Sequence, residues 1–350
     1  MAGTKHEGKV RLGIVGLDHW YIGLDAARAA AAHPDVDLIV VAHRDAARAR
    51  ETAERFGAAE ATGDYAGVVS RDDLDVVVTA CRTRDNAALC VEAARQGTHI
   101  VSVKPIAMTR AEAAHLKEAV DQAGVHFFSW ESGYRLSRRY QHLKSWIDEG
   151  RIGRPVSGLH VQRAGKPTQV WPGVQGETWW LDPAHAPGGG WVDHAIYAVD
   201  LFRWLFGDEV IAAGGTVATL VHKDLTPGLE DFGLAALTFG GGQVASLEVT
   251  WTGAPGAHIM ATHIVGSDGA IVLDPTAPGR ATVSGRFEPF SGWCTVPLPD
   301  DDRDPVASMV RALRNAASLP AGVADACRNL DVCLTFYEAA RAGCTKEVSP

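Results

Sequence analysis

The sequence predicts an α/β fold of two domains, a doubly wound parallel sheet followed by an α+β domain with a mostly antiparallel sheet. Its 350 residues correspond to about two domains of average size. From 10 to 130, short apolar runs alternate with helical stretches, as in parallel strands joined by crossover helices. Beyond 132, apolar residues at every second position of longer strands predict an antiparallel sheet. We expect a flexible leader at 1–9, a first domain at 10–132 and a second at 133–350.

Five segments of the first domain predict buried parallel strands, because each is rich in Val and Ile and lies between helical stretches. They span 11–15, 36–42, 76–80, 99–103 and 125–129. The clearest helix signal is a capping box made by Thr109 and Glu112. The helix that it opens is expected to run to about Ala123 and to end at Gly124.

The second domain begins with a helix predicted over 137–149. Strands are expected at 155–163, 210–221, 231–239, 245–251, 257–265 and 269–273. A glycine-rich stretch leads into a further helix from Gly188 to Gly207. The tail from 305 to 342 reads as two helices, broken at 319–322 and ended by Gly343; we expect them to pack back on the first domain.

Composition narrows the class of protein. The formal charge is -9 with both signs interspersed, so no basic face for nucleic acid or an anionic membrane is indicated. The apolar runs are far shorter than the roughly 20 residues of a bilayer span, and the polar leader has no apolar core of a secretory signal. Six cysteines without C-x-x-C pairs favour a reducing cytoplasm. No metal site is expected, since His258 and His263 face opposite ways on a strand.

The first strand leads into a glycine-containing turn, the place where a dinucleotide pyrophosphate binds in doubly wound folds. Gly13 and Gly16 fit, but Asp18 and Tyr21 stand where the second and third glycines of G-x-G-x-x-G belong. The alternative is that these glycines serve only a tight turn. In NAD-binding folds, an acid at the end of the second strand binds the ribose, but here His43 and Arg44 occupy this place. Arg44 favours the 2′-phosphate of NADP; the alternative is that Arg44 is simply a solvated surface arginine.

Two further motifs indicate reaction chemistry. Lys104 follows a strand at the carboxyl edge of the sheet, where ligands of α/β folds bind, and lysines rarely end buried strands without a reason. In the helix after Gly190, Asp193, Tyr197 and Asp200 are spaced i, i+4 and i+7, so they project from one face.

With these motifs the chain resembles the glucose-fructose oxidoreductase and inositol dehydrogenase (Gfo/Idh/MocA) family over nearly its whole length. The matching segments are the strand-one glycines, Val103-Lys104-Pro105 in place of Glu-Lys-Pro, Tyr134-Arg135, the 147–153 run and the helix 188–200. The resemblance implies an N-terminal Rossmann domain that binds NAD(P) and a C-terminal domain whose open sheet forms a homodimer or homotetramer. It also implies a small sugar or polyol as substrate.

The resemblance also implies roles for individual positions. Lys104, Tyr197 and Asp193 are the expected catalytic residues, with Lys104 lowering the pKa of the Tyr197 phenol and Asp193 holding a substrate hydroxyl. The cofactor is expected to contact Gly13, Gly16, Asp18, His19, Trp20, His43, Arg44, Cys81 and Lys104. The substrate is expected to contact Tyr134, Arg135, Trp179, His185, Asp193 and His194. For His194, the alternative to a ligand contact is packing within the protein. For Trp171, Trp179 and Trp180, two roles stay open: stacking against a sugar ring, and packing in the core or at an interface.

The chain departs from the family pattern at several positions. Val103 replaces a glutamate, Arg82 and Asn86 replace a proline and a histidine, and Ala195 replaces a glycine. The leading hypothesis is an NAD(P)-dependent dehydrogenase or reductase that interconverts a secondary alcohol and a ketone on a sugar, cyclitol or sugar-like metabolite. One alternative is non-redox elimination, hydrolysis or isomerisation with the nucleotide tightly held or absent. A silent ligand-binding or partner subunit is another.

Overall fold

The computed structural model describes residues 8–254 and 256–349, so most of the expected leader lies outside the described residues. The chain forms two compact units, described separately below. The first comprises 1–133, 168–187 and 304–327, and the second comprises 134–167, 188–303 and 328–350. The N-terminal unit therefore also contains a segment that follows β7 and a segment from the tail.

The first unit is built on a parallel sheet of six strands in the order β3-β2-β1-β4-β5-β6. Its strands are β1 Val10–Val15, β2 Val36–Ala42, β3 Glu60–Thr62, β4 Val76–Thr79, β5 His99–Ser102 and β6 Phe127–Ser129. The predicted doubly wound sheet is confirmed, and the order reverses between β1 and β4. That reversal is where α/β sheets bind ligands.

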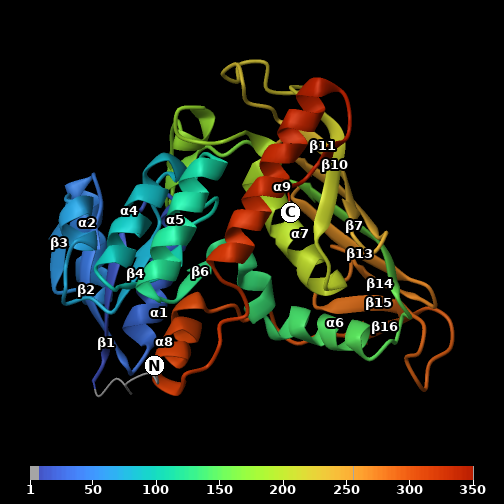
Figure 1. Cartoon of the computed structure of the whole chain (residues 1–350), viewed down its shortest axis with the longest axis horizontal. Helices are drawn as coiled ribbons and strands as arrows, with labels where there is room; N and C mark the ends of the chain where they lie inside the picture. The colour runs from blue at the N-terminus through green and yellow to red at the C-terminus, as the bar shows by residue number, and fades with distance from the viewer. Residues whose placement is uncertain (1–7, 255, 350) are drawn as a thin grey trace. The chain divides into compact units, whose positions relative to one another are not determined.

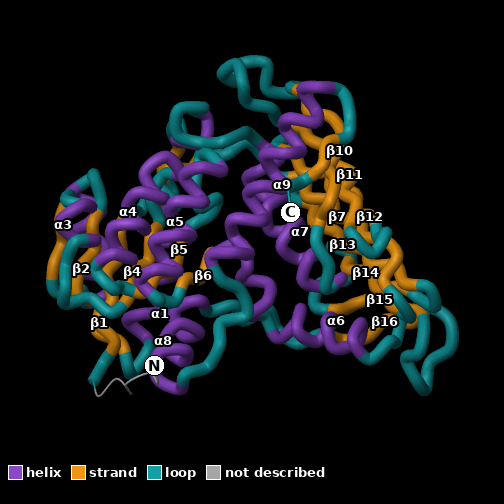
Figure 2. Tube along the Cα trace, in the orientation of Figure 1, coloured by secondary structure: helices purple, strands orange, loops and turns teal. Residues whose placement is uncertain are grey.

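Helices cover the parallel sheet on both faces (Figures 1 and 2). They are α1 Trp20–Ala32, α2 Ala46–Phe56, α3 Tyr65–Val69, α4 Thr83–Arg95, α5 Arg110–Ala123 and α8 Pro305–Asn315. The Thr109 capping box and the left-handed Gly124 at the end of α5 are both present, as predicted. From the tail, α8 packs against α1.

The second unit contains a nine-stranded sheet in the order β16-β15-β14-β13-β7-β12-β11-β10-β17. Every neighbouring pair is antiparallel except β7 with β12. Its strands are β7 Pro155–Arg163, β10 Val210–Ala218, β11 Phe232–Phe239, β12 Val244–Thr250, β13 Ile259–Gly266, β14 Ala270–Leu273, β15 Arg280–Ser284, β16 Cys294–Pro297 and β17 Lys346–Glu347. The predicted open, mostly antiparallel sheet is confirmed.

One face of this sheet packs against α7 Gly190–Phe206, which contacts β7, β11 and β12 (Figure 1). The other helices are α6 Arg138–Asp148 and α9 Val323–Ala342, and short 3-10 turns η1 Trp130–Leu136 and η2 Trp179–Leu181 complete the set. The small hairpin β8 Gln169–Trp171 and β9 Val174–Gln175 belongs to the segment 168–187.

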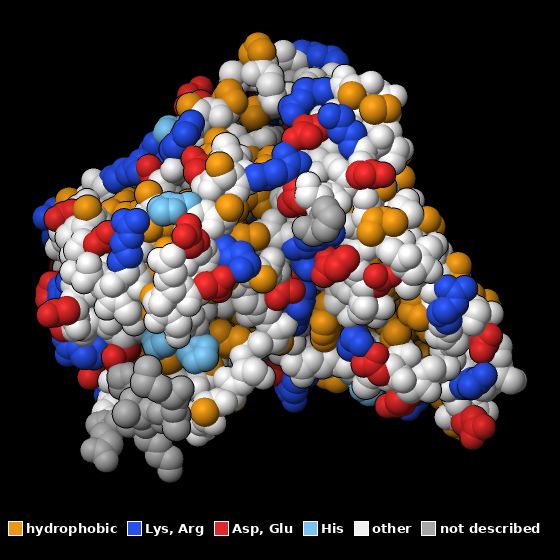
Figure 3. All heavy atoms as spheres, in the orientation of Figure 1, with side chains coloured by type: hydrophobic (Ala, Val, Ile, Leu, Met, Phe, Trp, Pro, Cys, Tyr) orange, Lys and Arg blue, Asp and Glu red, His pale blue; other side chains and the backbone are white. Residues whose placement is uncertain are grey.

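No described helix is long and apolar enough to cross a membrane. On the face drawn in Figure 3, basic and acidic side chains are interspersed, and neither sign forms one continuous patch. This distribution matches the mixed charge pattern of the sequence.

Candidate active site

The amine of Lys104 is enclosed at the carboxyl end of β5. Only 1% of the residue is exposed, although lysine is among the residues least often buried. Its Nζ lies 4.7 Å from the ring centroid of Trp180, close enough for a cation–π interaction. The segment 168–187 thus supplies an aromatic wall for this ammonium.

A buried polar network shapes the turn that carries Lys104. The Asn86 amide oxygen accepts a hydrogen bond from Thr79 Oγ1 at 2.6 Å. Its Nδ2 donates to Ser102 Oγ and to the Ile106 carbonyl, both at 2.9 Å. Asn86, a departure from the family pattern, therefore ties together the segments on either side of Lys104.

The glycine turn between β1 and α1 requires glycine at one position. Gly16 has a φ of +90°, and a Cβ there would lie 2.6 Å from the Cys81 backbone. Gly13 lies inside β1, where a Cβ would lie 2.9 Å from Leu74 and 3.2 Å from Val40. Gly16 thus allows the turn to approach the end of β4, and Gly13 allows the packing of β1.

Several amides of this turn already have protein acceptors. The N–H groups of Gly16, Leu17 and His19 donate to Ala42 O at 2.8 Å, His43 Nδ1 at 3.2 Å and Ala80 O at 2.9 Å. His19 occupies the N-cap position of α1 without a side-chain hydrogen bond to the first turn. An anion at this turn would therefore meet the start of α1 more readily than these three amides.

Asp18, which replaces the second glycine, belongs to a charged cluster. Its Oδ1 lies 3.4 Å from Arg82 Nε, and its Oδ2 accepts from the Tyr65 hydroxyl at 3.4 Å. The other side of the Arg82 guanidinium lies 3.1 Å from His185 Nε2. The negative charge of Asp18 is thus compensated by a cation.

The end of β2 presents Arg44 rather than an acid. His43 is buried, and burial is the main cause that lowers its pKa. Arg44 pairs with Asp85 and lies 5.3 Å from the centroid of the Tyr65 ring. Asp45 caps α2 through the Ala47 amide at 3.0 Å. Arg44 is therefore a positively charged group at this end of the strand, already paired with Asp85.

Aromatic side chains of the segment 168–187 cover the glycine turn. Trp179 Nε1 donates to the Asp18 carbonyl at 3.2 Å, and its ring stacks on Trp180 with centroids 4.4 Å apart. The His19 ring lies 4.8 Å from Trp179 and 5.5 Å from Trp180. The segment is consequently part of the first unit's candidate site.

In the second unit, Asp193 lies in the first turn of α7. Its Oδ2 accepts a hydrogen bond from Trp251 Nε1 at 3.1 Å and lies 3.3 Å from His194 Nδ1. The Asp193 side chain is 7% exposed and that of His194 is 29% exposed. The carboxylate is thus held in place by an indole, beside a more accessible histidine.

Tyr197 lies one turn further along α7, in an aromatic and cationic cluster. Its ring centroid is 6.1 Å from that of Tyr134 in a T-shaped arrangement. Arg303 Cζ lies 4.8 Å from the Tyr134 ring, and Arg303 also interacts electrostatically with Tyr197. Burial raises the pKa of Tyr134. Arg303, which no sequence motif marks, therefore adds positive charge beside Tyr197.

A buried histidine on β7 contributes a further polar group to the second unit. His160 Nδ1 lies 2.9 Å from Thr262 Oγ1 on the neighbouring strand β13. Burial lowers the pKa of His160 to about 4, so the imidazole is neutral at pH 7. An electrostatic interaction also relates it to His194.

The start of α7 is closed by an internal carboxylate. Glu230 accepts from the Gly189 amide at 3.1 Å and from the Trp191 amide at 2.9 Å. The Tyr337 hydroxyl donates to the same carboxylate at 2.7 Å. A Cβ at Gly189 would collide with the Glu230 backbone. The glycines 188, 189 and 190 therefore allow close packing against Tyr337, Glu230 and Trp251, respectively.

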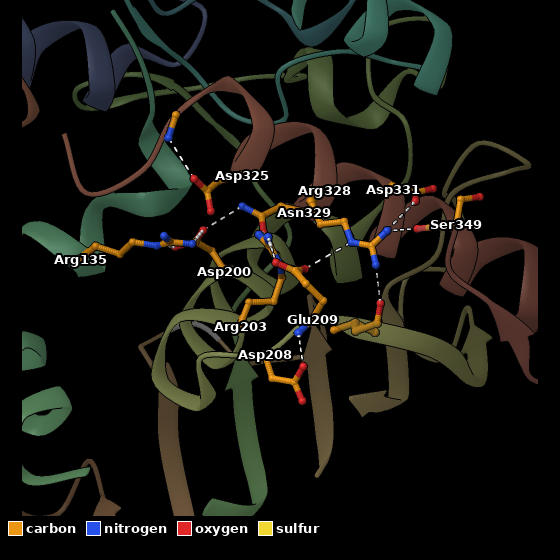
Figure 4. A network of polar contacts seen from close by, with 12 residues as sticks. Arg135, Asp200, Arg203, Asp208, Glu209, Asp325, Arg328, Asn329, Asp331 and Ser349 are labelled. Carbon is orange, nitrogen blue, oxygen red and sulfur yellow. Dashed lines mark hydrogen bonds and ion pairs between the residues drawn. The ribbon is translucent and has the colours of Figure 1, made fainter. Parts of the chain in front are cut away.

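Arg135 and Asp200 form a buried ion pair. The guanidinium donates to both carboxylate oxygens, at 2.9 Å from Nε and 2.8 Å from Nη2. Asn329 Nδ2 donates to Asp200 at 3.0 Å, and its oxygen accepts from Arg203 at 2.6 Å. Arg203 in turn makes a bidentate pair with Glu209 (Figure 4). This network joins α7 to α9 and to the start of β10.

Two family models match the chain. One, described as "Oxidoreductase family, NAD-binding Rossmann fold", matches residues 10–130, and the other, described as "GFO/IDH/MocA C-terminal domain", matches residues 140–272. The chain belongs to the GFO/IDH/MocA family of oxidoreductases.

Several relatives of this GFO/IDH/MocA chain are named dehydrogenases. Levoglucosan dehydrogenase from Pseudarthrobacter phenanthrenivorans is 27% identical, over 67% of this chain and 64% of the relative, so the match spans under two thirds of that protein's length. Myo-inositol 2-dehydrogenase from Thermotoga maritima is 24% identical, over 76% of this chain and 75% of the relative. The scyllo-inositol 2-dehydrogenase (NAD(+)) of Bacillus subtilis is also 24% identical, over 79% and 77%.

Solved structures share the fold at low identity. The oxidoreductase domain protein from Kribbella flavida superposes with a TM-score of 0.86 at 19% identity, over 98% of this chain and 100% of that one. A levoglucosan dehydrogenase in complex with NADH gives a TM-score of 0.85 at 22% identity, over 97% and 99%. Both therefore establish the arrangement of strands and helices.

The first unit fits the dinucleotide that the family model's description implies. Gly16 provides the backbone approach that a side chain would block, and α1 begins without a side-chain cap from His19. Asp18, the residue that argues against a pyrophosphate, is compensated by Arg82. The turn at Gly16 and the start of α1 are therefore compatible with a bound NAD.

Some residues that we expect to contact a ligand already contact other groups of the protein. Trp20 Nε1 donates to the Gln169 carbonyl at 3.1 Å, and Cys81 is fully buried, where burial raises its thiol pKa. Arg135 pairs with Asp200 and is 7% exposed. Ligand contacts by these residues and by Gly13 stay predictions.

Other features of the site could not be predicted from the sequence. The roles of Arg303, Glu230 and His160 depend on contacts between distant segments, and no short motif marks them. One signal was available, since Arg82 and His185 were both noted in the sequence. Their 3.1 Å contact joins positions 103 residues apart, which spacing alone could not predict.

Proposed function

We propose that the protein is an NAD(P)-dependent oxidoreductase that interconverts a secondary alcohol and a ketone on a sugar, cyclitol or sugar-like metabolite. The observation that carries the proposal is the enclosed amine of Lys104 at the carboxyl end of β5. Relatives named for levoglucosan and inositols support a polyhydroxylated substrate.

We assign proton transfer and the binding of substrate hydroxyls to Lys104, Tyr197 and Asp193. The nicotinamide, when bound, supplies the hydride acceptor and donor. Lys104 hydrogen-bonds the reacting hydroxyl, and Tyr197 takes its proton during oxidation and returns it during reduction. Asp193, held by Trp251, accepts a hydrogen bond from a neighbouring substrate hydroxyl. Arg303 stabilises negative charge on the Tyr197 phenol.

Substrate contacts are proposed for Tyr134, Arg135, Trp179, His185 and His194. The faces of Trp179 and Trp180 suit the C–H surface of a sugar ring. His194 is the most accessible polar group beside Asp193. A polyol that meets these residues would be bound by hydrogen bonds and stacking rather than by ionic attraction.

For the cofactor we infer NAD(P), with Arg44 as the group that favours NADP. The 2′-phosphate would compete with Asp85 for the Arg44 guanidinium, which limits the preference. Titration with NADH and NADPH measures it directly. We expect Arg44→Met to weaken NADPH binding by about tenfold, the value of one charge-assisted hydrogen bond, and to affect NADH less.

The test of the activity is hydride exchange, followed at the nicotinamide absorbance with a panel of sugars and cyclitols. Lys104→Ala should abolish turnover, by about a thousandfold or more, and leave the fold intact. Lys104→Met, of similar volume, controls for the cavity. Unchanged turnover in both variants would remove Lys104 from the mechanism, and no exchange with any panel member would count against the activity.

One observation favours the non-redox alternative. Three backbone amides of the glycine turn donate hydrogen bonds to acceptors within the protein rather than to a pyrophosphate. Thermal unfolding with NAD, NADH, NADP and NADPH separates the alternatives, because a ligand that binds only the native state raises the unfolding temperature. If none raises it and the purified protein carries no nucleotide, elimination, hydrolysis or isomerisation becomes the better proposal, or a silent binding subunit if no turnover is found.

We further infer a homodimer or homotetramer through the sheet face opposite α7. Leu234, Val244 and Val265 occupy outward positions there and are 40%, 49% and 41% exposed. A shared interface would remove this apolar surface from water. Sedimentation of the wild type and of Leu234→Asp tests the assignment.

The proposed location is the cytoplasm. All six cysteines are free in the described structure, and Cys81, Cys90 and Cys333 are buried. Free thiols persist in a reducing compartment. Fractionation of cells that express the full chain tests this inference.

A further inference from the structure

We propose that Arg82, held over the glycine turn by Asp18 and His185, is the cation that binds the dinucleotide pyrophosphate. The Asp18–Arg82 pair would then do the work of the missing second glycine. This inference rests on the proposed cofactor and concerns how this chain binds it.

The geometry places Arg82 beside the glycine turn, where the proposed cofactor would bring its phosphates. Gly16 packs against the backbone of Cys81, the residue before Arg82, so the turn and the start of α4 lie together. Asp18, two residues after Gly16, lies 3.4 Å from Arg82 Nε. The guanidinium is therefore beside the turn and not at a distant surface.

A cation would help to bind the phosphates, because backbone amides of the turn are already used within the protein. The amides of Gly16, Leu17 and His19 donate to acceptors within the protein. Asp18 also places a carboxylate where glycine normally gives the phosphates open space. Without compensation, that carboxylate would repel the pyrophosphate.

Arg82 is also free enough to change partners. Its side chain is 28% exposed, and it meets Asp18 through one long contact at 3.4 Å rather than a bidentate pair. A guanidinium has five donors, so it can retain Asp18 or His185 while it donates to phosphate oxygens. Asp18 and His185 thus act as positioning residues for Arg82.

The experiment measures dissociation constants by calorimetry for NADH and NADPH. Arg82→Met should weaken both by a similar factor, about tenfold to a hundredfold, because both contain the pyrophosphate. Arg84→Met is the matched control. Arg84 lies two residues after Arg82 and contacts the Ala184 carbonyl and Glu112 at the surface. This substitution should leave both constants within about twofold.

A second substitution tests the role of Asp18. In the Arg82→Met background, Asp18→Asn should recover part of the lost affinity, because it removes an uncompensated carboxylate beside the phosphates. Arg82→Lys keeps the charge and should lose less affinity than Arg82→Met. Unfolding without nucleotide shows whether each variant is folded, and Arg82→Lys carries the test if Arg82→Met is not.

The outcomes separate this inference from the proposed function. If the wild type binds both nucleotides and Arg82→Met binds them equally well, Arg82 does not bind the pyrophosphate, and the proposed cofactor stands. If Arg82→Met weakens NADPH alone, the arginine contacts the 2′-phosphate and the inference is wrong. If the wild type binds neither nucleotide, both proposals fail.

Discussion

The β1–α1 turn and the start of α7 are both glycine-containing helix starts, and they differ in what fills them. At α7, the enclosed carboxylate of Glu230 accepts two helix amides and the Tyr337 hydroxyl. At α1, Asp18 meets Arg82 at 3.4 Å, and the Arg82 side chain is 28% exposed. A helix start that carries its own buried acid has a structural role, whereas one bordered by an accessible ion pair can accept an external anion.

The same contrast separates the two arginine–aspartate pairs. Arg135 and Asp200 are bidentate, with side chains 8% and 0% exposed. Arg82 and Asp18 make one long contact, with side chains 28% and 8% exposed. Burial and geometry therefore predict a larger contribution to stability from the first pair than from the second.

The largest effect is expected for Asp200→Ala. It leaves the buried Arg135 without its carboxylate, so the free energy of unfolding should fall by about 3 to 5 kcal/mol. Urea denaturation measures the loss. Asp208→Ala, which removes a surface acid of the same region, is the control. A loss below about 1 kcal/mol for Asp200→Ala would end the contrast between the pairs.

An intermediate effect is expected for Glu230→Gln, visible in the pH dependence of stability. Burial is the main cause that raises the pKa of Glu230 to about 7, above the ordinary value of 4.5. The folded state therefore binds the proton more tightly than the unfolded state, and stability falls as pH rises from about 4.5 to 7. Glutamine removes this titration.

Denaturation of wild type and Glu230→Gln at pH 5 and pH 7.5 measures the difference. We expect the wild type to lose about 1 to 3 kcal/mol more than the variant over this range. If the stability of the two proteins depended on pH in the same way, the pKa of the Glu230 carboxylate would not be raised in the folded state.

The smallest effect is expected for Asp18→Asn. Its ion pair with Arg82 is long and partly exposed, so the free energy of unfolding should change by less than about 1 kcal/mol. The comparison with Asp200→Ala in the same denaturation series is direct. A loss as large as that of Asp200→Ala would make the Asp18–Arg82 pair structural and weaken the case for ligand binding there.

Much of the fold could be predicted because its signals are local. The apolar runs, the Thr109 capping box and the left-handed Gly124 and Gly343 follow from residue type and spacing. The short strands β3, β15, β16 and β17 and the hairpin β8–β9 were not predicted, and each of these strands has at most five residues. Such short strands depend on a neighbour in space and carry too few residues for a periodic pattern.

The candidate site was predictable only in part. Lys104 is marked by its place after a strand, and the face of α7 by helical spacing. The Gly188–Gly190 run is visible in the sequence, but its neighbour Glu230 lies 41 positions after Gly189 and no local pattern marks it. Arg135 similarly gave no sign of Asp200, 65 positions away.

Two buried acids, Asp200 on α7 and Glu230 beside the start of that helix, set an order on the folding of the protein. Asp200 is bound by Asn329 and Glu230 by Tyr337, and both partners lie on the last helix, α9. A nascent chain that has already emerged through β16 still lacks these two donors. The second unit can therefore complete its core only after α9 has been synthesised, while β1 to β6 can assemble much earlier on the ribosome.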